Sequence, residues 1–151
     1  NLLFAEASDN FAAYGVKGHR HHPEIVQGLA AASNAPVSLA FTPHLTPAIR
    51  GIFATLTFQA PGLTRAALRG CFERRYDGDR FVRIVEGTPR VAAVTGSNFA
   101  DISVEARDGA ACVMIAIDNL VKGMAGQAIQ NLNIARGWPE DQGLRVAGAF
   151  P

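Results

Sequence analysis

The sequence predicts an α+β fold in which helices cover one face of a mixed, largely antiparallel sheet. Three observations predict it. Apolar residues recur at helical spacing in separate stretches, stretches rich in β-branched and aromatic residues lie between them, and turn residues separate the two kinds. The 151 residues are 48% hydrophobic and 18% charged, which is enough to build the core of one compact domain over residues 1–151.

Three helices are expected. The first begins at Pro23-Glu24, because proline suits an early helical position and an acid suits the positive end of the helix, and it stops at Asn34 and Pro36. Thr64 is the N-cap of the second, which Asp77-Gly78-Asp79 ends. Asp118 caps the third and longest helix. Its apolar face is formed by Val121, Ala125, Ala128 and Leu132.

Strands are expected where apolar and β-branched residues alternate or run together. Asp108-Gly109 is a hairpin turn between the last two strands, and residues 43–47 form a loop because prolines stand at both ends. The expected strands are Val37–Thr42, Gly51–Phe58, Phe81–Val85, Val91–Thr95, Ile102–Ala106 and Ala111–Ile117.

Composition excludes several classes of protein. The net charge of +1 provides no basic stripe for nucleic acid, and the apolar run Ala110–Ile117 is too short to span a bilayer of about 30 Å. Cys71 and Cys112 fall at positions expected to be buried and lack paired spacing, so neither is predicted to be a nucleophile, a disulfide partner or a metal ligand. Without a targeting signal, the expected location is the cytoplasm.

The densest polar cluster is Gly18-His19-Arg20-His21-His22. If this segment is extended, His19 and His21 share a face and Arg20 points away. Imidazoles suit proton transfer near neutral pH, and a guanidinium suits a carboxylate or a phosphate. A solvated basic loop is the alternative. A zinc site is disfavoured because no further ligand segment accompanies the His-x-His pair, so no metal is expected.

Two other features admit both a functional and a structural interpretation. Arg50-Gly51 at the start of a strand places a guanidinium beside a bound anion, or beside a surface carboxylate. Gly123 and Gly126 lie within the last helix, where glycine costs up to about 1 kcal/mol relative to alanine. They indicate close approach either of a flat ligand or of another part of the chain.

Several segments together resemble N-acetyl-gamma-glutamyl-phosphate reductase, in the right order and over nearly the whole chain. The match is to the C-terminal substrate-binding and dimerisation domain, whose fold is of the semialdehyde-dehydrogenase and glyceraldehyde-phosphate-dehydrogenase type. The segments are GHRHHPEI (18–25), FTPHL (41–45), PAIRGI (47–52), GSNFAD (96–101) and IDNLVKGMAGQA (117–128).

The resemblance implies NADPH-dependent reduction of N-acetyl-glutamyl 5-phosphate to its semialdehyde in arginine biosynthesis. In this family the NADP-binding Rossmann domain and the nucleophilic cysteine precede the segment matched. The chain contains no G-x-G-x-x-G fingerprint, so this part alone is expected to be inactive. Two alternatives remain open: a non-catalytic dimerisation module, and the related reductase of lysine biosynthesis that acts on carrier-linked aminoadipyl phosphate.

The resemblance also implies roles for particular residues. His19 is the catalytic acid or base, and His21 and Arg20 bind substrate. The family does not assign Arg50, which is a substrate-binding candidate because a guanidinium suits an anionic group. The expected partners are the acyl phosphate, the Rossmann domain and further copies in a homodimer or homotetramer; a sheet of about six strands is expected to leave an apolar face for a second copy. The residues implied to lie on the cofactor side are Asn119, Leu120, Lys122, Gly123 and Gly126.

Overall fold

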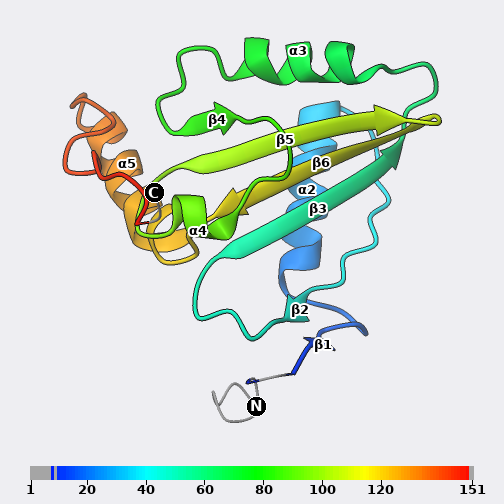
Figure 1. The fold of residues 1–151 in the computed structure, drawn as a ribbon, viewed down its shortest axis with the longest axis horizontal. Helices are drawn as coiled ribbons and strands as arrows, with labels where there is room; N and C mark the ends of the chain where they lie inside the picture. Colours follow the sequence, from blue (N-terminus) through cyan, green and yellow to red (C-terminus); the bar gives the residue numbers. More distant parts are fainter. Residues whose placement is uncertain (1–7, 9, 150–151) are drawn as a thin grey trace. The chain divides into compact units, whose positions relative to one another are not determined.

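A computed structural model describes residues 8 and 10–149 of the chain. The chain divides into two compact units, Asn1–Ile49 and Arg50–Pro151, which are described separately below. Figure 1 shows their elements along the chain.

The first unit contains one helix and a short ladder. Helix α2 (His21–Ser33) begins two residues earlier than predicted, so His21 and His22 belong to its first turn together with Pro23. It ends where Asn34 takes a left-handed conformation (φ 56°), which asparagine tolerates better than most residues. Strands β1 (Ala12–Ala13) and β2 (His44–Leu45) pair antiparallel.

The prediction of a strand over residues 37–42 is wrong, and so is that of a loop throughout residues 43–47. The segment 36–43 has no regular structure, whereas the next two residues form β2. The backbone groups here find partners outside a ladder: the carbonyl of Leu39 lies 3.0 Å from His22 Nε2, and that of Pro43 accepts the N–H of Tyr14 at 3.0 Å. Strand pairing is therefore not needed to satisfy these carbonyls.

The second unit is built on a four-stranded sheet, in the order β3 (Ile52–Gln59), β6 (Ala110–Ile117), β5 (Ala100–Arg107), β4 (Val82–Ile84). Only β4 and β5 pair in parallel, which confirms the predicted mixed, largely antiparallel sheet. Asp108 (φ 53°) and Gly109 (φ 78°) connect β5 to β6, as predicted; positive φ at both positions matches the twist of the flanking strands.

The expectation of one sheet of about six strands is wrong, because the sheet of this unit has four. Besides the segment in the first unit, residues 91–95 form a short helix, α4 (Val91–Val94), rather than a strand. Thr95 closes the turn by donating both its N–H (3.0 Å) and its hydroxyl (2.9 Å) to the carbonyl of Val91. Val94 is fully buried, so the apolar residues that resembled a strand serve to pack this turn.

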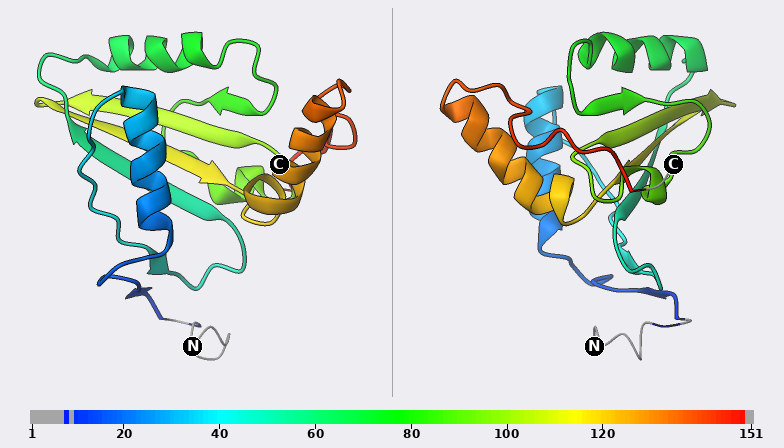
Figure 2. Two further views of the ribbon diagram at one scale, coloured as in Figure 1. Left: turned by 180° about the vertical axis from the view of Figure 1, so that it is seen from behind. Right: turned by 60° about the vertical axis from the view of Figure 1, so that its left-hand side comes forward.

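Helix α3 (Arg65–Arg75) forms the core with the sheet. Its N-cap is Thr64, as predicted, whose hydroxyl accepts the N–H of Ala67 at 3.2 Å. Leu68 packs against Ile102 and Val104 of β5, and Figures 1 and 2 show α3 lying along this side of the sheet. The register puts every second side chain of β3 on the same face, and three of these remain 40–46% exposed: Ile52, Leu56 and Phe58.

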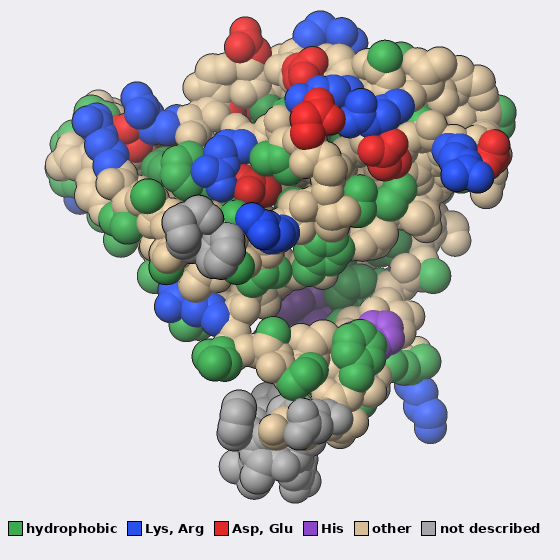
Figure 3. All heavy atoms as spheres, viewed as in Figure 1, with side chains coloured by type: hydrophobic (Ala, Val, Ile, Leu, Met, Phe, Trp, Pro, Cys, Tyr) green, Lys and Arg blue, Asp and Glu red, His purple; other side chains and the backbone are tan. Residues whose placement is uncertain are grey.

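Charged side chains cover the outside of α3 and β4, where Figure 3 shows basic and acidic groups intermixed. Arg65 contacts Glu86 at 2.6 Å and Glu105 at 3.1 Å, and Arg69 contacts Glu73 at 2.7 Å. Exposed pairs of this kind contribute about 0–1 kcal/mol each. They make this surface polar rather than hold the fold together.

The last helix differs from expectation in two ways. It opens with a π-helical turn, η1 (Val121–Ala125), before α5 (Gly126–Ala135), which lies beyond the end of the sheet where β6 finishes (Figure 2). Its apolar face is exposed, with Ile129 at 43% and Leu132 at 50%. The residues of α5 that are buried are Gly126 and Asn133, so the helix turns its polar side towards its own unit.

No helix in residues 8 and 10–149 is long and apolar enough to cross a membrane.

Candidate functional site

The histidine cluster lies at the start of α2. Arg20 is the N-cap residue and has helical dihedral angles (φ −56°, ψ −28°), so the predicted extended conformation is wrong. His19 and His21 are nevertheless adjacent, because a turn closed by a 2.9 Å hydrogen bond from the N–H of His22 to the carbonyl of His19 brings them together. Their ring centroids are 4.8 Å apart and the rings meet edge to face.

His19 also caps the helix. Arg20 makes no side-chain cap, and the N–H of His21 instead donates to His19 Nδ1 at 3.2 Å. The first N–H groups of a helix have no partner within the helix, so the imidazole supplies one of the missing acceptors. His19 Nε2 is the ring nitrogen that this contact leaves for other chemistry. Arg20 and His21 are exposed, whereas His22 Nε2 contacts the carbonyl of Leu39.

In the second unit, Arg50 and Asp118 form an ion pair at the end of the sheet. Arg50 Nε lies 2.7 Å from Asp118 Oδ2; the carboxylate is fully buried, and the Arg50 side chain is 33% exposed. This observation favours the structural interpretation of Arg50, with the difference that its carboxylate partner is buried rather than on the surface.

Asp118 also organises the backbone around it. Its Oδ2 accepts the N–H of Gly96 at 2.6 Å, and its Oδ1 accepts those of Leu120 and Val121 at 2.8 Å each. Asp118 was predicted to be the N-cap, but the N-cap residue of η1 is Leu120, two residues later. Burial raises the pKa of this carboxyl. The three backbone hydrogen bonds and the Arg50 side chain outweigh burial and lower the pKa to about 2.

Gly51 and Asn119 lie beside this ion pair. The N–H of Gly51 donates to Asn119 Oδ1 at 2.7 Å, which joins the start of β3 to the residue after Asp118. Gly51 has φ +108°, and a Cβ there would overlap Val91 of α4. Glycine is therefore required by this backbone conformation and by the approach of Val91, independently of any bound anion.

Of the remaining cofactor-side candidates, some are held by contacts within the second unit and others are exposed. Lys122 Nζ donates to Gln130 Oε1 at 2.9 Å and lies 5.6 Å from the centre of the Phe81 ring. Burial lowers the pKa of Lys122, against the opposing charges of Glu140 and Asp79. By contrast, Gly123 is exposed and Leu120 is 44% exposed.

Gly126 shows why a glycine is kept in this helix. A Cβ at this position would overlap Asn98 Oδ1 and Val121, so the loop carrying Asn98 packs directly on the helix backbone. A Cβ at Gly123 would come no closer than 3.4 Å to its neighbours. The internal contact therefore explains Gly126, whereas Gly123 has room for a side chain.

These two glycines give a matched pair of variants. We expect Gly126→Ala to lower the free energy of unfolding by about 2 kcal/mol, because the loop at Asn98 must shift. Gly123→Ala should leave it unchanged or raise it by up to about 1 kcal/mol, since alanine is the better helix former. Urea denaturation of both variants measures the difference; equal effects would contradict this account.

In each unit, one contact of a candidate residue could not be predicted from the sequence. Asp118 was identified only as a helix cap, and its pairing with Arg50 depends on the strand register. Phe41 was noted only within a resembling segment, yet its ring packs edge to face on His19 at 5.5 Å. The aromatic residue was visible in the sequence, but nothing local indicates which ring it contacts.

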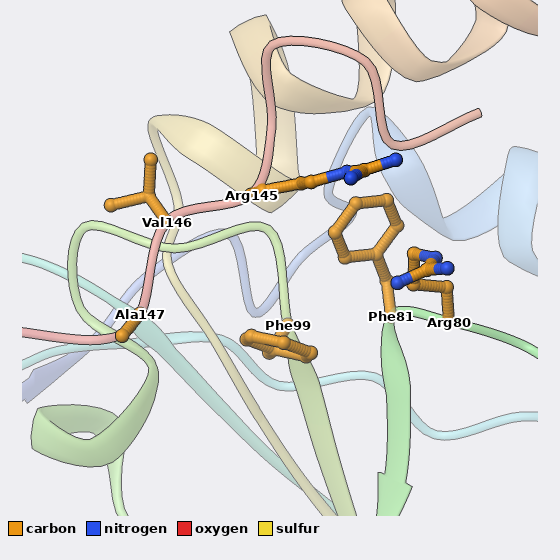
Figure 4. Close-up of a pocket in the computed structure, with 6 residues that line it drawn as sticks. All are labelled: Arg80, Phe81, Phe99, Arg145, Val146 and Ala147. Carbon is orange, nitrogen blue, oxygen red and sulfur yellow. The ribbon is translucent and has the colours of Figure 1, made fainter. Parts of the chain in front are cut away.

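A pocket of about 290 Å³ lies elsewhere in the second unit and contains none of the candidate residues. Figure 4 shows the Phe81 and Phe99 rings on its wall with the guanidinium groups of Arg80 and Arg145 nearby. Both guanidinium groups pair with the buried Asp141, at 2.7 and 2.9 Å, and these pairs lower the pKa of its carboxyl. The two arginines thus share one protein carboxylate, whose single charge offsets only one of theirs.

Both cysteines are free in the part of the chain described. Cys71 is exposed, contrary to the expected burial, and Cys112 is half-buried in β6. No group of three or more His, Cys, Asp or Glu side chains within residues 8 and 10–149 is arranged to hold a metal ion.

Comparison with known proteins defines the class of this chain. Residues 1–119 match the family of the semialdehyde dehydrogenase dimerisation domain, which has the α+β character described above. The chain belongs to this family.

The curated relatives are more specific, and they confirm the resemblance found in the sequence. Proteins named N-acetyl-gamma-glutamyl-phosphate reductase align with all of this chain in Laribacter hongkongensis (51% identity) and in Nitrosomonas europaea (49%). The one from Desulforamulus reducens aligns with 98% of the chain at 48% identity. The chain spans 44–45% of the length of these relatives.

Proposed function

We propose that this chain is the substrate-binding and dimerisation part of a reductase that converts N-acetyl-glutamyl 5-phosphate to its semialdehyde with NADPH, in the cytoplasm. The observation that carries the proposal is that relatives named N-acetyl-gamma-glutamyl-phosphate reductase match essentially the whole chain at about 50% identity. Since the chain spans less than half of their length, the Rossmann domain and the nucleophilic cysteine belong to the remainder of such a protein.

His19 is the proposed acid and base. With Nδ1 accepting the N–H of His21, the neutral ring carries its proton on Nε2. In this tautomer Nε2–H donates a hydrogen bond to the oxyanion that forms during reduction and stabilises it, whereas accepting the proton of the attacking thiol requires the other tautomer, with Nε2 unprotonated. His21 and Arg20 are exposed at the N-terminal end of α2, where an anionic substrate is also favoured by the helix dipole.

Arg50 is the proposed contact for a negatively charged group of the substrate. Asp118 Oδ2 attracts the buried Nε at 2.7 Å, while the side chain as a whole remains 33% exposed and so can meet a ligand. The role of Asp118 in this proposal is to orient Arg50 and the backbone of residues 119–121.

The five residues proposed for the cofactor side differ in what they offer. Leu120 and Gly123 present exposed apolar surface against which a nicotinamide ring fits. Asn119, Lys122 and Gly126 are engaged by Gly51, Gln130 and Asn98, so they shape the turn that carries the other two. When bound, the cofactor supplies the hydride.

The experiment is a reductase assay on the full-length protein that carries this chain. N-acetyl-glutamyl phosphate and carrier-linked aminoadipyl phosphate are compared, each with NADPH and with NADH. NADPH oxidation and phosphate release with the first substrate support the proposal. Activity only with the second substrate assigns the chain to the lysine-type reductase, and a stable dimer without activity on either substrate assigns it to a non-catalytic dimerisation module.

A further inference from the structure

His19 is surrounded by rings within the first unit. Tyr14 lies 5.4 Å from it at an interplanar angle of 74°, His21 4.8 Å at 70° and Phe41 5.5 Å at 71°. Edge-to-face contacts of this kind are worth about 0.5–1.5 kcal/mol each beyond the area they bury. The backbone of Gly15 also packs closely on this ring, because a Cβ there would lie 3.0 Å from His19 Cδ2.

The fold brings these groups together from separate segments. The β1–β2 ladder and the hydrogen bond from the N–H of Tyr14 to the carbonyl of Pro43 join the chain before His19 to the segment that carries Phe41. On the other side, His22 Nε2 contacts the carbonyl of Leu39 and ties that same segment to the first turn of α2. Phe41 is therefore held near His19 at both ends of residues 39–43.

An imidazole needs such support to keep one orientation. The torsion between its Cβ and its ring is broad and roughly two-fold, so an unsupported ring flips and exchanges the positions of its nitrogens and carbons. A flip would move Nδ1 away from the N–H of His21 and remove the contact that selects the Nε2-protonated form. The Phe41 ring packs against His19 and opposes that flip.

We propose that Phe41 is a positioning residue that holds the His19 imidazole with Nδ1 on the His21 N–H, so that the proton of the neutral ring stays on Nε2. The part that concerns catalysis rests on the proposed function, in which Nε2–H donates to the oxyanion. The part that concerns the tautomer does not, and it can be tested in the chain itself.

The variants are Phe41→Leu, which keeps an apolar side chain without a ring, and Phe41→Tyr, which restores the ring. Phe11→Leu is the matched control, because Phe11 packs on another histidine of the same unit, His44, at 5.3 Å. Nitrogen-15 NMR of the imidazoles in the 151-residue chain reports the tautomer, with the His19 signals assigned by their loss in His19→Asn. The amide signals of α2 show whether each variant is folded, and Phe41→Met replaces Phe41→Leu if that variant is not.

The expected result is an Nε2-protonated His19 in the wild type, in Phe41→Tyr and in Phe11→Leu, and a mixture of tautomers in Phe41→Leu. In the full-length enzyme, Phe41→Leu should lower kcat by about 10-fold with KM changed less than about two-fold, because a misplaced catalytic group affects the chemical step. A single unchanged tautomer in folded Phe41→Leu overturns the inference. If Phe41→Leu changes the tautomer but the wild-type full-length protein has no reductase activity, the positioning role of Phe41 is supported and the proposed function is refuted.

Discussion

Replacing His19 by asparagine in the full-length protein should lower kcat by about 10²–10⁴-fold, the usual contribution of general acid–base catalysis. Asparagine is the informative replacement because its carbonyl oxygen can accept the N–H two residues later, as His19 Nδ1 does for His21. The helix cap is then preserved while the exchangeable proton is lost. A fall in rate therefore reports chemistry rather than unfolding of α2.

The measurement is steady-state kinetics with N-acetyl-glutamyl phosphate, accompanied by circular dichroism to compare helix content. His44→Asn is the control, since His44 lies in the same unit on β2, where its Nδ1 contacts the carbonyl of Thr42. It should keep kcat within a few-fold of the wild type. If His19→Asn also stays within a few-fold, His19 is not the acid or base.

Replacing Asp118 by asparagine should lower the free energy of unfolding by about 3 kcal/mol, the scale seen when one partner of a buried ion pair is removed. Both carboxylate oxygens of Asp118 face donors: Oδ2 faces Arg50 and Gly96, and Oδ1 faces the backbone after the strand. The amide NH₂ of asparagine must therefore point at a donor in either orientation. Arg50 also loses its charged partner.

The same carboxylate predicts a pH dependence. Its pKa of about 2 in the folded state is below the value of about 3.9 in an unfolded chain. A lowered pKa stabilises the fold above the unfolded-state pKa, and this stabilisation is lost as the pH falls from about 4 to about 2. The difference corresponds to about 2–3 kcal/mol. Asp118→Asn should remove that part of the acid sensitivity.

Urea denaturation at pH 7 and at pH 3 tests both statements. Asp108→Asn is the control, because Asp108 is an exposed turn residue with φ 53°, a conformation that asparagine adopts well. Its unfolding free energy should stay within about 0.5 kcal/mol of the wild type. An equally small change in Asp118→Asn would show that the Arg50–Asp118 pair does not stabilise the fold.

Local signals in the sequence predicted the elements whose causes are local. Thr64 caps α3 and Asp108-Gly109 closes the hairpin because each acts on residues beside it in the chain. The short segment 91–95 was mistaken for a strand because its apolar residues suit both structures, and only the burial of Val94 in the folded unit decides between them. The apolar stripe of α5 was also visible, but which side of the helix faces the unit was not.

The candidate site was predictable as a set of residues and not as an arrangement. Arg50 and Asp118 meet because Ile52 pairs with Ile117, so the chain just before β3 lies beside the chain just after β6. That register depends on how distant segments pair in the folded unit, and no local pattern in the sequence predicts it. His19 and His21 were expected to share a face through strand geometry, whereas a helix start brings them together. The expected proximity held although its structural reason was wrong.

The exposed apolar side of α5 lies close in the chain to a residue whose fluorescence can report binding there. The chain has one tryptophan, Trp138, which follows the helix, is 49% exposed and donates its backbone N–H to the carbonyl of Asn133 at 2.9 Å. Indole fluorescence shifts to shorter wavelength when water is excluded. A shift of the Trp138 emission to shorter wavelength therefore reports the binding of a molecule or polypeptide at the end of that helix, without an added dye.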